Sequence, residues 1–218
     1  MSIPWNFMRI GRRRGSPVVA SLSAVSTPPR TELVLMRHGE TDWNRSQLVQ
    51  GHDDASRLTD EGREHVGAVA ATLSEESFSL IVASDLGRAQ ESAAIAARIL
   101  RLEIVTLALL RERNFGVLEG GPRSALTPQH TGVSNDVVID VNARPPGGES
   151  LEDMAQRARR FFDLVHHSWP NTSLLVVTHG GMIRALMSAA SGESLLGSTL
   201  APVANCSLWR LSLEQSPQ

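Results

Sequence analysis

The sequence predicts an α/β fold in which a mostly parallel central sheet lies between two layers of helices. From Thr31 onward, short apolar runs alternate with amphipathic or alanine-rich stretches, as strands connected by helices do. Two of these apolar runs end directly in a histidine and a glycine, where a parallel strand reaches the ligand-binding edge of its sheet. With 218 residues, of which 41% are hydrophobic, the chain is long enough to bury one core without disulfides or a structural metal.

Residues 1–30 are expected to form a separate N-terminal extension. They carry five arginines and no acidic residue, they are rich in serine and proline, and no strand or helix period persists in them. Three interpretations stay open: a disordered tail, an organellar targeting segment, or an incorrectly assigned start of the chain. No apolar run reaches the roughly 18 residues of a membrane span. We therefore expect a cytoplasmic protein without a membrane partner, with organellar targeting as the alternative.

Five strands and four main helices follow in the rest of the chain. The strands are short apolar runs, and we place them at 32–37, 79–84, 103–107, 173–178 and 203–211. The helices are amphipathic or alanine-rich, and we place them at 59–74, 85–100, 150–168 and 181–191. Thr59 fits an N-cap, and Ser150 with Asp153 three residues later resembles a capping box. The segment 116–148 is rich in Gly, Pro, Ser and Asn, so we expect a long connection that covers a site.

Composition excludes several classes of function. Cys206 is the single cysteine, so the chain alone forms neither a disulfide nor a thiolate zinc cluster, and a reducing compartment is expected. Lysine is absent, which excludes Schiff-base chemistry and a P-loop. Residues 31–218 contain 16 arginines against 23 acidic residues, which argues against a nucleic-acid partner. No metalloprotease, EF-hand or serine-hydrolase motif occurs, and we predict no metal and no cofactor.

Two histidines stand at the ends of buried strands. The segment 33–39 reads Leu-Val-Leu-Met-Arg-His-Gly, and the segment 174–181 reads Leu-Leu-Val-Val-Thr-His-Gly-Gly. Ligands of open α/β sheets bind beyond the carboxyl ends of the strands, so we expect His38 and His179 to meet in one crevice. The glycines that follow, Gly180 among them, allow close approach of the backbone there. A lone histidine is more often structural, but a matched pair favours a functional site.

These two segments open and close a longer ordered series of motifs. The series is Arg37-His38-Gly39-Glu40-Thr41, Trp43-Asn44, Gln50-Gly51, Leu58-Thr59 with Gly62, Ser84-Asp85-Leu86 with Arg88-Ala89, Leu110-Arg111-Glu112, Phe115-Gly116, Glu119-Gly120, Gly147-Gly148-Glu149-Ser150 and Thr178-His179-Gly180-Gly181. In this order the motifs resemble the histidine phosphatases, also called the phosphoglycerate-mutase-like superfamily, from Glu32 to about Leu211. The resemblance implies a three-layer α/β/α fold and a histidine phosphatase domain at 31–218.

The resemblance also implies five catalytic residues. His38 is the nucleophile that forms a phosphohistidine, a role that suits neutral imidazole because one ring nitrogen can attack while a hydrogen bond holds the other. Arg37 and Arg88 bind phosphoryl oxygens, for which the planar guanidinium is well shaped. His179 completes the phosphate pocket, and Glu112 acts as general acid and base. By itself, a glutamate flanked by arginines would be an exposed ion pair, and a single helix-start arginine would be solvated.

The binding residues implied by the resemblance are Asn44, Gln50, Gly51, Arg113 and Gly180. Asn44 adds a neutral donor, and Gln50 with Gly51 lines the pocket, although an ordinary polar turn explains those two equally well. Arg113 directly after the glutamate resembles the branches in which this arginine meets a second anionic group of the substrate. Two departures from the family pattern leave substrate contacts open: residues 53–57 replace a shorter proline-containing link, and Leu118 stands where many members have tryptophan.

The resemblance therefore implies a metal-independent phosphatase that hydrolyses phosphomonoesters, with small sugar phosphates or phosphoglycerate-like metabolites as its partners. A cofactor-dependent phosphoglycerate mutase is the first alternative, and we prefer hydrolysis because only 116–148 is available to exclude water. A protein phosphatase or a phosphate-binding regulatory module is the second. Trp209, Val203 and Leu211 alternate along the last strand, where core packing is the favoured interpretation and the edge of a homodimer the other.

Overall fold

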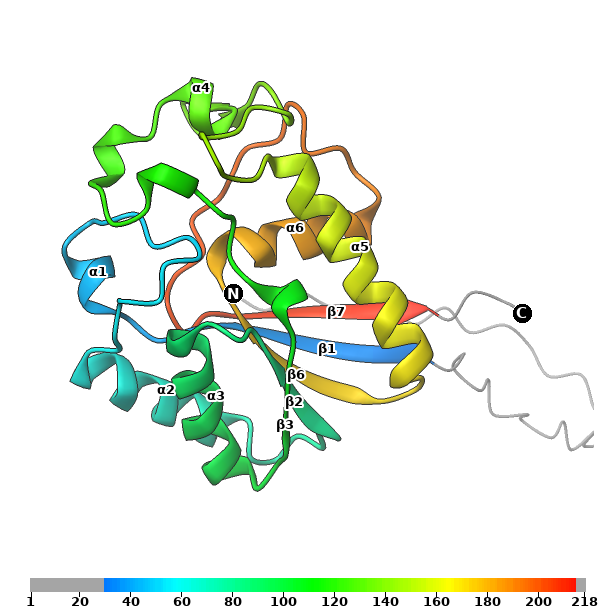
Figure 1. Cartoon of the computed structure of the whole chain (residues 1–218). Coiled ribbons are helices and arrows are strands. Elements are labelled where there is room, and N and C mark those ends of the chain that lie inside the picture. The colour runs from blue at the N-terminus through cyan, green and yellow to red at the C-terminus, as the bar shows by residue number, and fades with distance from the viewer. Residues whose placement is uncertain (1–29, 215–218) are drawn as a thin grey trace, which may run out of the picture.

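The computed structural model describes residues 30–214, and in it five strands form one sheet in the order β3-β2-β6-β1-β7 (Figure 1). The strands are β1 Arg30–Arg37, β2 Leu80–Ala83, β3 Ile104–Thr106, β6 Ser173–Thr178 and β7 Leu208–Glu214. Neighbouring strands are parallel, except that β7 runs antiparallel to β1 at one edge. The predicted mostly parallel sheet is confirmed. The extension predicted for 1–30 lies outside the described residues, apart from Arg30, which begins β1.

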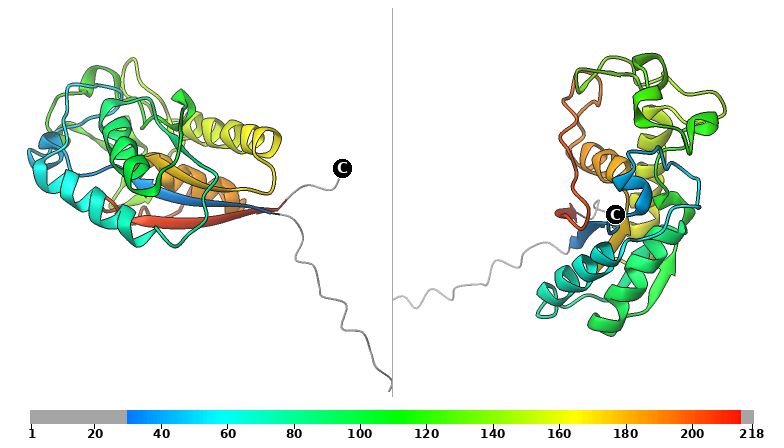
Figure 2. Two further views of the ribbon diagram at one scale, coloured as in Figure 1. Left: turned by 90° about the horizontal axis from the view of Figure 1, so that it is seen from below. Right: turned by 90° about the vertical axis from the view of Figure 1, so that its left-hand side faces the viewer.

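Helices cover both faces of this sheet (Figure 2). The main helices are α2 Asp60–Thr72, α3 Gly87–Leu100, α5 Leu151–Ser168 and α6 Gly180–Ser191. Leu33 and Leu35 of β1 pack in one core cluster with α5 and α6, whereas Val34 and Met36 pack in a second cluster with α2 and α3. Successive side chains of a strand point to opposite faces, so an apolar run becomes buried on both sides. The three-layer α/β/α architecture is confirmed.

The helix starts follow the capping residues of the sequence. Thr59 Oγ1 accepts a hydrogen bond from the backbone N–H of Gly62 at 2.9 Å, which caps α2. Ser150 Oγ accepts from the N–H of Asp153 at 3.1 Å, and the Asp153 carboxylate accepts from the N–H of Ser150 at 2.8 Å. This second pair is a complete capping box at the start of α5. Both predicted caps are confirmed.

The last strand was predicted wrongly at 203–211, because β7 runs from Leu208 to Glu214. The alternation of apolar residues from Val203 suggested a strand, but the segment before Leu208 crosses the carboxyl end of the sheet instead. There the carbonyl of Val203 accepts from Arg37, and the N–H of Cys206 donates to the Arg37 carbonyl at 3.1 Å. Trp209 packs against the core cluster of α5 and α6, in agreement with core packing.

The connection predicted at 116–148 does cover one end of the sheet. It contains short 3-10 turns (η2 Gly116–Leu118 and η3 Arg123–Ala125), helix α4 Pro128–Thr131 and the hairpin β4 Val133–Ser134 and β5 Val137–Val138. The remaining short elements are α1 Asp42–Arg45 and η1 Ala108–Leu110. Val137 forms a β-bridge with Thr199, so the hairpin is tied to the segment after α6. None of the helices in 30–214 has the length and apolar character needed to cross a membrane.

Candidate active site

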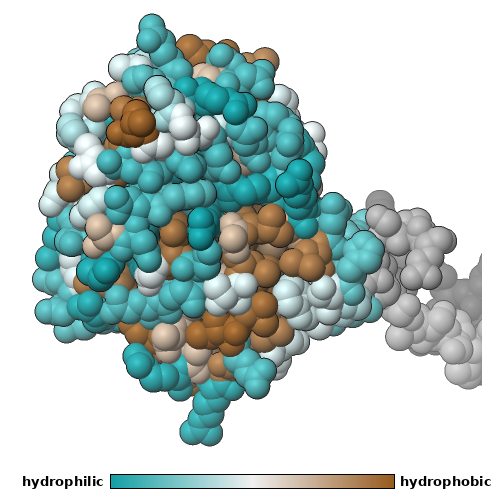
Figure 3. Space-filling model, in the orientation of Figure 1, coloured by the Kyte–Doolittle hydropathy of each residue, from teal (hydrophilic) through white to brown (hydrophobic). Residues whose placement is uncertain are grey.

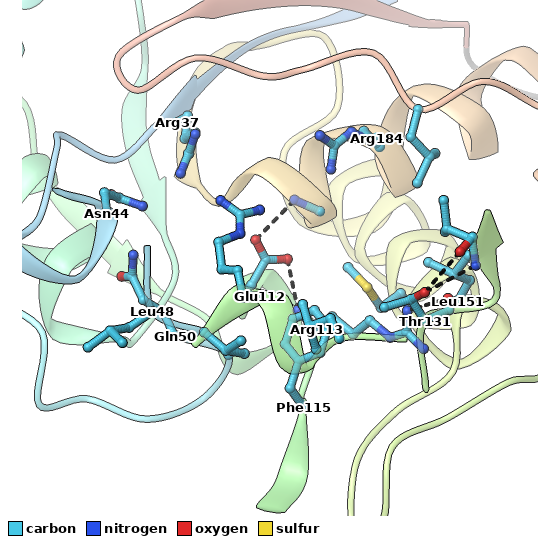
Figure 4. A pocket seen from close by; sticks show the side chains of 18 of the residues that line it. Arg37, Asn44, Leu48, Gln50, Glu112, Arg113, Phe115, Thr131, Leu151 and Arg184 are labelled. Atoms are coloured by element: carbon cyan, nitrogen blue, oxygen red, sulfur yellow. Dashed lines mark hydrogen bonds between the residues drawn. The ribbon is translucent and has the colours of Figure 1, made fainter. Parts of the chain in front are cut away.

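A cavity of about 410 Å³ opens at the carboxyl end of the sheet (Figure 4). Eight of the ten predicted site residues line it, namely Arg37, His38, Asn44, Gln50, Gly51, Arg88, Glu112 and Arg113. The ninth, His179, lies beside His38, because the parallel pairing of Arg37 with Thr178 brings the residues after β1 and β6 together. The two imidazole centroids are 5.1 Å apart, which confirms that the two histidines meet at this edge of the sheet. His38 lines the cavity, and His179 is fully buried behind it.

His38 presents one free ring nitrogen to the cavity. Its Nδ1 lies 2.7 Å from the carbonyl oxygen of Gly39, and because a carbonyl only accepts, we assign the ring proton to Nδ1. Nε2 then carries the lone pair, and none of the groups in 30–214 is hydrogen-bonded to it. Burial lowers the pKa of His38 well below its ordinary value, and the positive charges of Arg37 and Arg88 lower it further. The imidazole is therefore neutral and suited to nucleophilic attack.

His179 is fully buried, and only one of its two ring nitrogens has a hydrogen-bond partner among residues 30–214. Its Nε2 lies 2.9 Å from Ser84 Oγ, whereas Nδ1 is buried without a hydrogen-bond partner among the described residues. Burial is the main cause that lowers its pKa well below 6.5, followed by the nearby charge of Arg88. An unsatisfied buried nitrogen costs free energy unless a ligand supplies the missing partner. Nδ1 of His179 is therefore a buried atom with which a polar ligand could form a hydrogen bond.

Arg37 of β1 and Arg88 of α3 contribute positive charge to the cavity. The Arg88 guanidinium donates to the carbonyl oxygens of Asp53 and Gly51 at 3.1 and 2.7 Å, and Arg37 donates to that of Val203 at 2.6 Å. Within 30–214, neither arginine forms an ion pair, and the Nε of each is buried without a partner. Burial lowers the pKa of Arg37 to about 10. Guanidinium groups that lack a directly paired carboxylate attract an oxyanion.

The carboxylate of Glu112 is fixed on both oxygens. Oε1 accepts from the backbone N–H of Arg113 at 2.8 Å, and Oε2 accepts from that of Gly181, in the first turn of α6, at 3.0 Å (Figure 4). A Cβ on Gly181 would stand 2.1 Å from Oε1, so only glycine permits this approach. Close backbone approach was expected of the glycines that follow the two histidines, and Gly181 confirms it. At Gly180, by contrast, a Cβ would make an ordinary contact of 3.6 Å with Arg37.

The sequence had suggested that Arg113 presents its guanidinium to a ligand. In the structure the guanidinium turns to backbone carbonyls instead. Nε donates to the carbonyl oxygen of Glu149 at 2.8 Å, and the terminal nitrogens donate to those of Thr131, His130 and Ala143 at 2.8 to 3.0 Å. Four of its five N–H groups thus anchor the connection above the site. Adjacency to Glu112 in the sequence carries no information about side-chain direction, because neighbouring residues of an extended backbone point opposite ways.

The turn at Gln50 and Gly51 holds Arg88 in place, because the carbonyl oxygen of Gly51 accepts from its guanidinium. Gly51 adopts φ +51°, and a Cβ there would stand 2.0 Å from Oε1 of Glu119. The same oxygen accepts from the N–H groups of His52 and Phe115, both at 2.8 Å, which ties the turn to η2. Thr41 caps α1, and Asn44 completes the capping box by accepting from the backbone N–H of Thr41 at its Oδ1. The amide nitrogen of Asn44 points toward the cavity (Figure 4). Asn44, Gln50 and Gly51 thus line the same cavity as His38.

Two cavity arginines were missed in the sequence. Arg123 and Arg184 both line the cavity. Helical spacing could have indicated Arg184, since it lies three residues after Gly181 on α6 and so on the same face. Arg123 lies in the irregular connection, where no periodicity predicts a direction. Among residues 30–214, no group of three or more His, Cys, Asp or Glu side chains is arranged to hold a metal ion.

Similarity to known proteins shows the family to which this chain belongs. A family model described as the histidine phosphatase superfamily (branch 1) matches residues 33–217. The chain belongs to the histidine phosphatase superfamily. The resemblance carried by the motifs is therefore confirmed, and it extends over nearly the whole of the part of the chain that the structure describes.

Relatives of this histidine phosphatase include proteins named as a mutase and as phosphatases. It is 35% identical over 187 residues to the "Probable phosphoglycerate mutase GpmB" of Yersinia enterocolitica, which spans 85% of this chain and 86% of that protein. A mycobacterial glucosyl-3-phosphoglycerate phosphatase solved with VO3 matches with a TM-score of 0.71 and 30% identity, covering 82% of this chain and 90% of the other. For the alpha-ribazole phosphatase of Shigella flexneri the TM-score is 0.66 and the identity 28%, with 75% and 81% covered. This histidine phosphatase is an enzyme of the phosphoric monoester hydrolase class.

The two buried histidines predict that this histidine phosphatase loses stability in mild acid. An unfolded imidazole has a pKa near 6.5, and both folded pKa values lie well below it. Between these values the unfolded chain binds more protons, so the free energy of unfolding falls as the pH drops below about 6.5, by up to about 1.4 kcal/mol per pH unit for each histidine. Urea unfolding between about pH 7.5 and 5 measures this slope.

The control for this pH slope is a histidine on the surface. His38→Asn removes one titrating group and is expected to flatten the slope, whereas His65→Asn, at an exposed position of α2, should leave it unchanged. Carboxylates whose pKa is lowered in the folded state also reduce the free energy of unfolding as the pH falls. They do so only near pH 4 and below, because their unfolded pKa values lie there. An equal slope in His38→Asn and wild type would contradict a neutral buried His38.

Proposed function

We propose that this chain is a metal-independent phosphatase that hydrolyses small phosphomonoesters through a phosphohistidine on His38. One observation carries the proposal: the neutral Nε2 of His38 faces a cavity lined by Arg37 and Arg88, and neither arginine forms an ion pair with a carboxylate of residues 30–214. Together with Nδ1 of His179, the Nε atoms of these arginines account for three of the four buried side-chain polar atoms without a partner in 30–214. A tetrahedral oxyanion would satisfy such a set.

In the first half-reaction, Nε2 of His38 attacks phosphorus in line, and the bond between phosphorus and the ester oxygen breaks. Glu112 gives its proton to the departing alkoxide. In the second half-reaction, water attacks the phosphohistidine, Glu112 takes a proton from that water, and inorganic phosphate leaves with His38 neutral again. Arg37, Arg88 and His179 bind the non-bridging oxygens, whose charge must be met by fixed donors since phosphoryl transfer depends on positioning and electrostatics.

The size of the cavity favours a small substrate. A volume of about 410 Å³ is within the usual range for small-molecule pockets. The neighbours named above are a glucosyl-3-phosphoglycerate phosphatase and an alpha-ribazole phosphatase, and both names describe small phosphorylated compounds. We therefore propose sugar phosphates or phosphoglycerate-like metabolites as the substrate class. Because the single cysteine favours a reducing compartment, we place the activity in the cytoplasm.

Mutase activity is the second candidate, and the name of the curated relatives favours it. A mutase would return the phosphoryl group of the phosphohistidine to a hydroxyl of the product instead of passing it to water. A third candidate is a module that binds a phosphorylated partner without turnover. All three use the same oxyanion position, so only the fate of the phosphoryl group distinguishes them.

The test is release of inorganic phosphate from a panel of phosphomonoesters in the presence of EDTA. The panel contains an aryl phosphate, 3-phosphoglycerate, fructose bisphosphates and a ribose phosphate, and phosphorus NMR follows any movement of the phosphoryl group within 3-phosphoglycerate. We expect release that resists the chelator. Isomerisation of 3-phosphoglycerate faster than phosphate release would favour the mutase, and bound phosphate without any turnover would favour the binding module.

A further inference from the structure

The backbone that carries His38 lies beyond the last paired residue of its strand. Pairing of β1 with β6 ends at Arg37, and the N–H of His38 donates to the carbonyl oxygen of Thr178 at 2.9 Å. The carbonyl groups of His38 and Gly39 come after this point, so the ladders of the sheet supply no donors for them. Glycine restricts the backbone least of all residues, so the direction of the Gly39 carbonyl depends on its hydrogen-bond partners.

The side-chain amide of Asn205 donates to both carbonyl groups. Its Nδ2 lies 3.0 Å from the carbonyl oxygen of His38 and 3.1 Å from that of Gly39. It also lies 3.2 Å from Oδ1 of Asn44, so its two hydrogens are shared among three oxygens. The N–H of Cys206 stands farther off, at 3.4 Å from the His38 oxygen. Asn205 is therefore a main support of the backbone on either side of Gly39.

Asn205 is itself held firmly, because the turn that carries it is bound to β1 in both directions. The N–H of Cys206 donates to the carbonyl oxygen of Arg37 at 3.1 Å, and the N–H of Arg37 donates to that of Ser207 at 3.2 Å. The guanidinium of Arg37 donates to the carbonyl oxygen of Val203 at 2.6 Å. This turn belongs to the segment that passes over the carboxyl end of the sheet before β7, orange to red in Figure 1. The amide of Asn205 is thus a donor in a fixed position.

The Gly39 carbonyl decides which ring nitrogen of His38 carries the proton. While its oxygen lies 2.7 Å from Nδ1, the proton stays on Nδ1, and Nε2 keeps the lone pair that attacks phosphorus. If the carbonyl turned away, the proton could move to Nε2, and that lone pair would be lost. The hydrogen bond from Asn205 holds the same oxygen in the direction that Nδ1 needs. Through Oδ1 of Asn44, Asn205 also keeps the amide nitrogen of Asn44 directed toward the cavity (Figure 4).

We propose that Asn205 is a positioning residue for phosphoryl transfer, which fixes the Nδ1–H tautomer of His38 and the aim of Nε2 by binding the carbonyl oxygens of His38 and Gly39. This inference rests on the proposed phosphatase function. Asn205 is not among the residues that line the cavity, so it acts through groups that touch the substrate and not on the substrate itself. Its loss should therefore change the imidazole and the rate of phosphoryl transfer more than the affinity for phosphate.

The experiment compares the wild type with Asn205→Ala by two readouts. The first is ¹⁵N NMR of enzyme labelled at its histidines, in which the ring signals of His38 are assigned by their absence from His38→Asn. We expect the Nδ1–H tautomer in the wild type and a mixture of tautomers in Asn205→Ala. The second is the rapid-quench rate of phosphoenzyme formation from 4-nitrophenyl phosphate. This rate should fall by about 10- to 100-fold, since a shift of a reacting group by about 1 Å has effects of this size.

An Asn44→Ala background separates the two contacts of the amide. Adding Asn205→Ala to Asn44→Ala should slow phosphoenzyme formation by the same factor as in the wild type. A factor near one in that background would mean that Asn205 acts only through Asn44, and it would overturn the inference. The matched control is Asn142→Ala, at an exposed position of the connection that does not line the cavity, and it should match the wild type in both readouts.

The remaining outcomes also distinguish the inference from the proposed function. An unchanged tautomer of His38 in Asn205→Ala would overturn the inference, and so would a loss of affinity for inorganic phosphate as large as the loss of rate. The NMR readout needs no turnover, so absence of a phosphoenzyme in the wild type would refute the proposed function alone. If Asn205→Ala fails to fold, Asn205→Asp keeps the shape but lacks the N–H donors. A wild-type tautomer and rate in Asn205→Asp would overturn the inference.

Discussion

Replacement of His38 by alanine is expected to lower kcat for phosphate release by at least ~10⁴-fold and to abolish the phosphoenzyme, since loss of the nucleophile of a covalent mechanism has effects of about this size. The expectation follows from the position of Nε2, which faces the cavity with its lone pair while Nδ1 is held by the Gly39 carbonyl. Alanine removes the attacking atom but leaves Arg37 and Arg88 in place. Phosphate binding should therefore survive the loss of turnover.

The measurement is rapid quenching of the enzyme with a radiolabelled phosphomonoester, followed by separation of protein-bound label. A phosphohistidine is labile in acid and stable in alkali, which distinguishes it from a phosphoserine. The matched control is His65→Ala at an exposed position of α2, which should label as the wild type does. Label retained in His38→Ala would identify another nucleophile, and His179 would be the first to test because its ring lies 5.1 Å from that of His38.

Replacement of Glu112 by glutamine is expected to have the second largest effect, and the effect should depend on the leaving group. An alkoxide needs a proton as it departs, so kcat on an alkyl phosphate should fall by about 10² to 10⁴-fold. A nitrophenolate departs without a proton, so kcat on 4-nitrophenyl phosphate should fall by less than about tenfold. Comparison of the two kcat values in the same variant measures this contrast.

The contrast between the two kcat values is needed because Glu112→Gln also changes the hydrogen bonds of the site. Both carboxylate oxygens of Glu112 accept backbone N–H groups, from Arg113 and Gly181, and a glutamine can accept only one of them. A general disturbance of the site would lower both rates alike. Equal losses on the two substrates would therefore remove Glu112 from proton transfer. Glu64→Gln, on the exposed side of α2, is the surface control and should change neither rate.

Local sequence information was sufficient for most of the scaffold. Apolar runs with no polar face predict strands buried on both sides, and Leu33 to Met36 do divide between the two core clusters. The caps at Thr59 and Ser150 predict helix starts because a side-chain oxygen a few residues away satisfies the free N–H groups. Likewise, a histidine directly after a parallel strand must lie at the carboxyl edge of the sheet. The sequence thus placed His38 and His179 at the same edge of the sheet, and the pairing of β1 with β6 brought them together.

Side-chain direction in irregular segments was not predictable. The sequence could not show that Arg113 turns away to four backbone carbonyls, or that Arg123 and Arg184 face the cavity in its stead. It likewise misplaced the last strand, because the segment at Val203 passes over the site before β7 begins. Each of these outcomes depends on partners many residues away in the chain.

The sequence by itself thus determined the layers of this histidine phosphatase and the residues at the ends of its strands, since a period of two and a capping side chain act over a few residues. Only the tertiary structure decided which arginines keep free donors. A buried guanidinium takes whatever carbonyl or ligand oxygen the folded chain brings within reach, and that choice is made across distant segments. The guanidinium of Arg113 donates to backbone carbonyl oxygens, whereas Arg184 lines the cavity.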